Sequence, residues 1–412
     1  MGIENQWSRR RFVLAAAAGA GALLVPPYLR ASSRRIAPGG TLRMGVATLP
    51  PDTLADAGMD LGMQEAVRTA QLFGWKLELV RPSVAPSDIV ADLRALAAAG
   101  ARVVVTAVGD AQLAAMAPVA EQLGILLVNG AAPADSLRGC GRLLFHVAPS
   151  RSMLVDAAAR WLAPGKPQRL AVLAAGDAVS TALADRFDRV FASEGGGAPT
   201  RRALPAAGDA SSYSALVGTA DVFVVIGPVP AADALIAGWQ RGGPHGGPIL
   251  VDLADRQPRR VDDPDPPRPS GVAVLQPVAW HGSLERFGAD QLNQRYRRVF
   301  HWAMEESAWG GWAAMKIAVE AAIRAGSGEP SAIAAYLAGG AAEFDGQKGW
   351  PLSFRPWDHQ LRQPIYLAEG APNAGHVVDE LPAAPRGATR DSARVLDSLG
   401  VARGEAACKV RT

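Results

Sequence analysis

Short apolar segments alternate with longer helical segments along most of this 412-residue chain, and this alternation limits its possible folds more than any other feature. In the first third, strand-like runs cover residues 41–47, 75–80, 103–105 and 125–128. Segments with helical spacing lie between them, at residues 59–72, 86–99 and 111–123. Short buried strands separated by helices are typical of parallel βαβ units, with helices on both faces of the sheet.

The same pattern then begins again. A second block has strand-like runs at residues 170–173, 200–204, 222–226, 249–251 and 272–276, and helical segments at 152–162, 180–192 and 231–240. Later helical segments cover 284–302, 309–325 and 331–338, and short strands cover 352–354 and 364–367. We therefore predict an α/β fold with two doubly wound, Rossmann-like lobes. The Pro/Gly-rich end of the chain is predicted to lie along the surface.

The N-terminal segment has the pattern of an export signal. Residues 8–14 read SRRRFVL and lead into an apolar run over residues 12–25. Paired arginines ahead of an uncharged segment are typical of substrates of the twin-arginine translocase. The apolar run is shorter than the ~20 residues of a permanent membrane-spanning helix. We predict that residues 1–32 are a twin-arginine signal segment, cut near Ala31, and that the protein works in the periplasm. An uncleaved membrane anchor is the alternative.

The charge of the remaining chain excludes a nucleic-acid-binding role. The chain has 42 basic and 39 acidic residues. Four of the basic residues and one of the acidic residues lie within residues 1–32, which leaves 38 of each sign. A balanced chain without a basic stripe has no electrostatic footprint for nucleic acid or for an anionic membrane. Its length exceeds what one hydrophobic core usually supports, so two domains are expected.

The chain has two cysteines, Cys140 and Cys408. Exposed free thiols are uncommon in an oxidising compartment, so we predict a disulfide between these two residues. The alternative is two unrelated buried thiols.

Three segments carry a resemblance to a known family. Residues 146–151 read HVAPSR and precede a helical segment; residues 310–326 read GGWAAMKIAVEAAIRAG; and residues 344–349 read FDGQKG, followed by LSF at 352–354. In this order they resemble the type I solute-binding proteins of ABC importers, the branched-chain amino-acid-binding-like class. The resemblance implies two lobes joined by a multi-strand hinge, a solute bound between them, an ABC permease and ATPase as partners, no enzymatic activity and no cofactor.

The resemblance also implies domain boundaries. Lobe 1 is expected to comprise residues 36–148 and 278–343, lobe 2 residues 149–277 and 344–367, and the C-terminal surface tail residues 368–412. A narrower similarity lies in LSFRPWDHQLRQPIYL at residues 352–367 and in the ending from Leu399-Gly400 to Cys408. These segments are similar to a subfamily of binding proteins associated with PQQ-dependent alcohol oxidation. That similarity implies either an alcohol-related solute or uptake of a lanthanide or other metal.

Motifs for catalysis are absent from the sequence. It has no G-x-S-x-G, Walker, H-E-x-x-H or C-x-x-C motif, and no G-x-G-x-x-G after a strand. His301 and Glu305 are spaced to share a metal if one helix carries both, although a solvated pair is the simpler interpretation. An exported enzyme with another kind of site, and a scaffold protein that kept the fold without transport, remain the alternatives to a binding protein.

Ligands of open α/β sheets bind beyond the carboxyl ends of the strands, and polar residues follow several predicted strands. The candidate ligand-binding residues are Asp52, Asp110, Asn129, Asp177, Asp252, Gln276 and Trp280. Clustered aspartates favour a cation or a hydroxyl-rich solute. Alternatively, the aspartates only cap helices, and Trp280 with apolar groups lines a cleft for an alcohol. An α-amino acid is disfavoured because Asp110 and Ala131-Ala132 stand where the family places hydroxyl donors.

Overall fold

The structure is a computed structural model of the chain. It describes residues 39–49, 53–81, 88–165, 167–216, 218–242, 249–254, 272–340, 342–371, 374–382 and 392–405. The predicted signal segment, Asp52 and Cys408 lie outside these ranges. Within them, no helix is both long enough and apolar enough to cross a lipid bilayer.

Five of the described strands form a parallel sheet in the order β2-β1-β3-β4-β5. The strands are β1 (Thr41–Thr48), β2 (Lys76–Val80), β3 (Val103–Ala107), β4 (Leu126–Asn129) and β5 (Leu144–His146). Every residue of the central strands β3 and β4 is buried. This is expected for a sheet with both faces covered, and it explains the unbroken apolar runs in the sequence.

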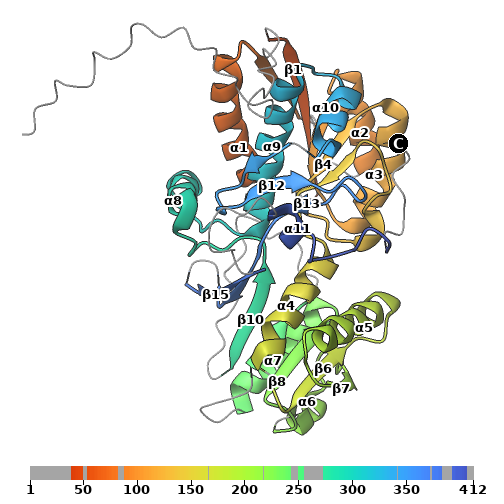
Figure 1. The fold of residues 1–412 in the computed structure, drawn as a ribbon, viewed down its shortest axis with the longest axis vertical. Helices are drawn as coiled ribbons and strands as arrows, with labels where there is room; N and C mark the ends of the chain where they lie inside the picture. The colour runs from red at the N-terminus through yellow and green to blue at the C-terminus, as the bar shows by residue number, and fades with distance from the viewer. Residues whose placement is uncertain are drawn as a thin grey trace, which may run out of the picture. The chain divides into compact units, whose positions relative to one another are not determined.

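Helices cover both faces of this first sheet (Figure 1). They are α1 (Leu54–Leu72), α2 (Ile89–Ala98), α3 (Asp110–Leu123), α9 (Glu306–Ala325) and α10 (Pro330–Ala338). Val103 and Val105 pack with α1 and α9, whereas Val104 between them packs with α2 and α3. Helices α1 and α9 approach closely: a Cβ on Gly58 would lie 1.9 Å from the backbone oxygen of Ala308, so only glycine fits there.

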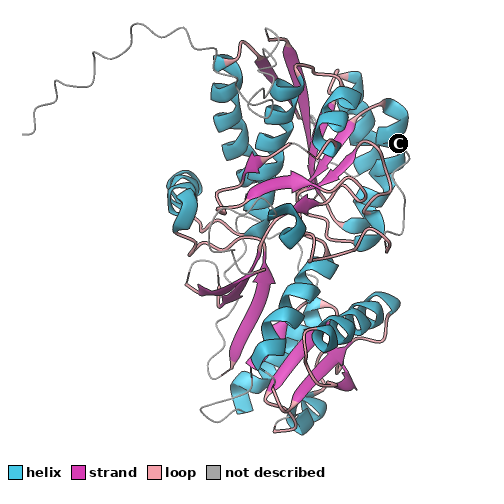
Figure 2. Cartoon of the chain, in the orientation of Figure 1, coloured by secondary structure: helices cyan, strands magenta, loops and turns pink. Residues whose placement is uncertain are grey.

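Seven described strands form the second sheet, in the order β15-β14-β10-β9-β8-β6-β7. They are β6 (Leu170–Ala174), β7 (Thr200–Ala203), β8 (Val222–Ile226), β9 (Ile249–Asp252), β10 (Ala273–Val278), β14 (Ile365–Glu369) and β15 (His376–Leu381). Strands β6 to β10 are parallel, and β14 and β15 join antiparallel at the edge. Helices α4 (Arg151–Gly165), α5 (Ala178–Ser193), α6 (Ala210–Leu216) and α7 (Val229–Gly242) flank it (Figure 2). The prediction of an α/β fold with two helix-covered sheets is confirmed.

The segment after residue 367 differs from the predicted surface tail. Strand β15 extends the second sheet, and helix α11 (Ser392–Leu396) follows. The side chains of Leu396 and Leu399 are fully buried in the same core cluster as Phe354. Arg355, also fully buried, donates to the backbone oxygens of Leu396 and Leu399. Because these carbonyls pair a buried guanidinium, residues 396–399 belong to the interior and not to a surface tail.

The predicted single helix over residues 284–302 is interrupted. A short 3₁₀ turn, η3 (Arg286–Gly288), precedes helix α8 (Ala289–Phe300). Phe287 and Gly288 have φ angles of 58° and 88°, which a continuing helix cannot contain. Helix α8 then ends at His301, whose φ is 64°, and Glu305 is the N-cap of α9. His301 and Glu305 therefore do not lie on one helix.

Three short described strands form a third sheet, β11 (Phe344–Asp345), β12 (Pro351–Phe354) and β13 (Leu361–Arg362). They come from the FDGQKG segment and the stretch after it. A further 3₁₀ turn, η2 (Asp135–Leu137), lies between β4 and β5.

Candidate functional site

Asp110 lies beyond the carboxyl end of β3, as predicted, and is the first residue of α3. One carboxylate oxygen accepts the backbone N–H of Ala134 at 2.9 Å, and the other accepts Arg151 Nη2 at 2.6 Å. Arg151 is the first residue of α4, at the start of the second βα block. The carboxylate thus joins three segments at this edge, and an arginine balances its charge.

Asn129 ends β4 and is fully buried. Its Oδ1 accepts the backbone N–H groups of Ala131 at 3.1 Å and Ala132 at 2.8 Å. Its Nδ2 donates to the oxygen of Ala132 at 2.8 Å and to His146 Nδ1 at 3.1 Å. Each polar atom of this amide therefore has protein partners.

His146 ends β5 beside Asn129 and is also fully buried. Since its Nδ1 accepts from Asn129, its Nε2 carries the proton and donates to the oxygen of Leu137, 3.2 Å away. Burial, with a smaller contribution from the charge of Arg138, holds the pKa of His146 well below its usual range. The imidazole is therefore neutral at physiological pH.

Arg138, which the sequence analysis did not single out, is the central group of this edge. Its side chain is fully buried. It donates to Gln360 Oε1 at 3.0 Å, to the oxygens of Ala132 and Ala134 at 3.1 and 2.6 Å, and to the oxygen of Ala148 at 3.1 Å. Burial lowers the pKa of Arg138 to about 10, so the guanidinium stays charged at neutral pH.

Two glutamines fix the segment that leaves the first sheet after β5. Gln360 Nε2 donates to the oxygens of His146 and Ala148 at 3.3 and 3.0 Å. Gln363 Nε2 donates to the oxygen of Val147 at 2.7 Å. Gln360 also accepts from Arg138, and Arg138 donates to the oxygen of Ala148. The backbone of residues 146–148 is therefore fixed by hydrogen bonds from both side chains.

At the second sheet, Asp177 and Asp252 differ in burial. Asp177 is exposed and is the N-cap of α5; it accepts the backbone N–H of Ser180 at 2.9 Å and Ser180 Oγ at 2.6 Å. Those bonds to Ser180 lower the pKa of Asp177. Asp252, which ends β9, is buried. It accepts Gln276 Nε2 at 2.8 Å and the N–H of Ala254 at 2.9 Å.

Asp252 and Gln276 are thus two predicted site residues that the fold brings together. Leu275 on β10 pairs with Val251 on β9, which places the following residues side by side. Trp280, by contrast, lies in the core: its ring is fully buried, stacks on Trp309 at 5.9 Å between centroids, and donates Nε1 to Asn293 Oδ1 at 2.9 Å. Asp52 lies outside the described residues.

Two ionisable side chains, Glu306 and Lys348, lie where β10 ends and α9 begins; Glu306 is half-buried and Lys348 is buried. Glu306, in the first turn of α9, accepts the backbone N–H of Ala279. Lys348 is 1% exposed; its Nζ donates to Gln363 Oε1 at 2.8 Å and lies 3.7 Å from the ring centroid of Trp309. Burial lowers the pKa of Lys348 and raises that of Glu306, although each charge partly offsets the shift of the other.

Within the described ranges, no three His, Cys, Asp or Glu side chains are grouped to hold a metal ion. Cys140 lies in the segment after η2. Because Cys408 is outside the described residues, the Cys140–Cys408 disulfide stays a prediction.

The fold and these sites were compared with known proteins. A sequence profile described as "periplasmic binding protein" matches residues 52–375. No curated protein matches the chain in sequence. A solved ABC transporter substrate-binding protein from Desulfitobacterium hafniense, in complex with Leu, superposes with a TM-score of 0.65 at 16% identity, covering 82% of this chain and 100% of that one.

A second solved structure has the same fold. The solute-binding protein of an ABC transporter from Rhodopseudomonas palustris, in complex with 3,4-dihydroxybenzoic acid, has a TM-score of 0.64 at 16% identity, covering 84% of this chain and 98% of that one. At such identities the likeness concerns the fold.

Proposed function

This chain belongs to the periplasmic binding protein family, and from that premise we propose that it is the substrate-binding component of an ABC importer. In this role it captures a small solute between its two α/β lobes in the periplasm and delivers it to a permease driven by an ATPase. Export by the twin-arginine translocase belongs to the same proposal. The transport role is supported by the two solved structures of the same fold described above, which are both binding proteins of ABC transporters.

The lobe boundaries of this proposal follow the two larger sheets. Residues 344–361 depart from them, because Phe344, Leu352, Phe354 and Leu361 pack in the core cluster of the first sheet. Lobe 1 comprises residues 36–148 and 278–343, and lobe 2 residues 149–277 and 344–367. Consistent with this division, α9 and α10 pack with the first sheet, whereas β14 pairs with β10 of the second. Domain closure in such proteins bends the few segments that pass between the lobes.

We further propose that the solute is a small neutral molecule with hydroxyl groups. The observation that carries this is the Asp252–Gln276 pair, in which a buried carboxylate and a half-buried amide meet at 2.8 Å at the carboxyl edge of the second sheet. A hydroxyl group can donate its proton to the carboxylate and accept a hydrogen bond from the amide N–H, so this pair suits an alcohol. The similarity of residues 352–367 to binding proteins of alcohol-oxidising systems favours the same class.

A metal ion is the less favoured cargo. A hard cation needs several carboxylate oxygens at once. Asp110 is engaged by Arg151, Asp177 by Ser180, and Asp252 by Gln276. To bind an ion, these carboxylates would have to give up bonds that the fold already provides. Leucine is disfavoured for a different reason, since Ala131 and Ala132 offer no side-chain donor to its carboxylate.

Thermal-shift and calorimetric titrations of the mature protein test this proposal. The probes are 1-propanol, glycerol, Ca²⁺, La³⁺ and leucine. We expect stabilisation by a hydroxyl-bearing probe, by RT ln(1 + [L]/Kd), and at least tenfold weaker binding in Asp252→Asn. Asp221→Asn, which changes an exposed carboxylate paired with Arg169 just before β8, is the matched control and should bind normally.

The other outcomes are equally informative. Binding of La³⁺ or Ca²⁺ that Asp252→Asn abolishes would replace the neutral solute with a cation. Micromolar binding of leucine would restore the amino-acid interpretation. If no probe or wider metabolite panel changes the melting temperature, the protein is a scaffold that kept the fold, and the transport role is wrong.

A further inference from the structure

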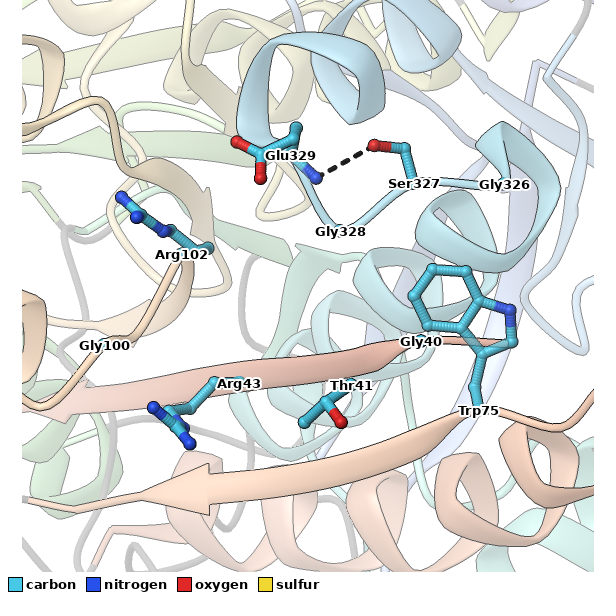
Figure 3. Close-up of a pocket in the computed structure, with 10 residues that line it drawn as sticks. All are labelled: Gly40, Thr41, Arg43, Trp75, Gly100, Arg102, Gly326, Ser327, Gly328 and Glu329. Atoms are coloured by element: carbon cyan, nitrogen blue, oxygen red, sulfur yellow. Dashed lines mark hydrogen bonds between the residues drawn. The ribbon is translucent and has the colours of Figure 1, made fainter. Parts of the chain in front are cut away.

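A pocket lies at the opposite, amino-terminal edge of the first sheet, away from the candidate residues above (Figure 3). The start of β1, the residues preceding β2 and β3, and the end of α9 surround its volume of about 550 Å³. Strand β3, which joins the two edges, has 5 residues. At about 3.3 Å per residue, the pocket is on the order of 15 Å from Asp110. It is therefore a site separate from the proposed solute cleft.

Two exposed side chains of opposite charge line the pocket. Arg43 is already paired with Glu78, since its Nε and Nη2 both lie 2.8 Å from Glu78 Oε2. Arg102 and Glu329 also line the pocket. Throughout the described ranges, neither the Arg102 guanidinium nor the Glu329 carboxylate has a hydrogen-bond or ion-pair partner. Figure 3 shows Arg102 in the residues before β3 and Glu329 in the turn before α10, both at the pocket.

Two glycines and a hydroxyl form the rest of the wall, with Trp75 behind the glycines (Figure 3). A Cβ on Gly40 would lie 3.6 Å from Trp75 Cζ3, and one on Gly328 would lie 4.0 Å from the same atom. Trp75 is only 5% exposed, so Gly40 and Gly328 form the surface in front of the indole ring. Ser327 Oγ accepts the N–H of Glu329 at 3.1 Å, and its own proton is left to donate.

We propose that this pocket binds a small zwitterion, with its carboxylate on Arg102, its ammonium on Glu329 and its aliphatic body along Gly40 and Gly328, the glycines in front of Trp75. A simple anion would meet repulsion from Glu329, and a simple cation repulsion from Arg102. A molecule that carries both charges pairs with each group. Guanidinium–carboxylate pairing adds directional hydrogen bonds to the charge attraction. The inference does not depend on the proposed transport role.

Calorimetric titration with 4-aminobutyrate, butyrate and butylammonium tests the proposal. The three probes share a four-carbon chain and differ in charge. We expect 4-aminobutyrate to bind at least tenfold more tightly than either single-charge probe. Arg102→Gln and Glu329→Gln should each remove that preference.

Two further variants make the result specific. Gly328→Leu should abolish binding by filling the pocket, and it is compatible with the backbone, because a Cβ there meets nothing closer than 3.7 Å. Arg142→Gln removes an exposed arginine whose partner is Glu121 and should bind normally. Asp252→Asn should also bind normally, which separates this site from the solute cleft. Equal affinity for the three probes, or a preference that survives Arg102→Gln, would overturn the proposal.

Discussion

The carboxyl edges of the two sheets differ in how their polar groups are used. At the first sheet, Asn129, His146 and Arg138 are fully buried and bonded to one another or to backbone carbonyls. At the second sheet, Asp177 is exposed and bonds to Ser180 within its own helix cap, and Asp252 bonds to a half-buried amide. Buried, fully satisfied networks fix a structure, whereas exposed groups can exchange partners. We infer that the first edge is a rigid support and that the second adapts to the solute.

Removal of Arg138 should have the largest effect. Arg138→Ala leaves Gln360 Oε1 without its donor, and the oxygens of Ala132, Ala134 and Ala148 each lose one of two donors. An unpaired buried acceptor costs about 1–3 kcal/mol, and loss of a fully buried side chain also leaves a cavity, so we expect the free energy of unfolding in urea to fall by about 3 kcal/mol. The control is Arg142→Ala, whose exposed pair with Glu121 should contribute less than about 1 kcal/mol. Equal effects of the two variants would contradict a rigid first edge.

Acid should weaken the first edge through His146. In the unfolded chain this histidine takes up a proton near its ordinary pKa of 6.5, whereas burial lowers that pKa in the folded protein. The unfolded state therefore binds more protons below pH 6.5, and the free energy of unfolding falls by up to about 1.4 kcal/mol per pH unit. The loss ends when pH reaches the folded-state pKa.

The variant His146→Gln isolates this contribution. Two other buried histidines, His281 and His359, also have lowered pKa values, so the wild-type protein loses stability in acid for several reasons. Urea unfolding of both proteins at pH 7.5 and 5.5 should show a smaller acid loss in the variant. An identical loss in both would mean that His146 is protonated in the folded state.

The smallest effect is expected at the second edge. Asp177→Ala removes the N-cap of α5, at a cost of about 1 kcal/mol in the free energy of unfolding. Asp177→Asn keeps an acceptor for the N–H of Ser180 and should remain within a few tenths of a kcal/mol of wild type. A loss in Asp177→Ala as large as that in Arg138→Ala would remove the contrast between the edges.

Much of the fold could be predicted because it depends on local patterns. The unbroken apolar run of residues 103–105 predicted a strand covered on both faces, and β3 has that environment. Asp177 was a candidate ligand residue with helix capping as the alternative, and its position before a helical segment and its bond to Ser180 N show the cap. Asp252 and Gln276 could be placed at one edge because adjacent parallel strands end together.

Other features depend on distant parts of the chain. Arg138 lies among glycines and polar residues, which is typical of an exposed loop; its burial depends on Gln360, 222 residues away. Trp280 was a candidate for the cleft because it follows a strand end, but Asn293 and Trp309 hold it in the core. The break at Phe287 has no local signal stronger than the glycine after it. The spacing of apolar residues within one helix or strand does not show which distant residues its side chains will contact.

The partners of Arg355 have a consequence for how the protein is made. Its guanidinium is fully buried and bonds to the oxygens of Leu396 and Leu399. Asp156, on α4, likewise accepts the N–H of Gly400 at 2.6 Å, across 244 residues. While the ribosome is still translating residues 1–390, these buried groups have no such partners. The native interior can therefore form only after residues 396–400 have been synthesised, and a chain shortened before α11 should depend on chaperones and be degraded.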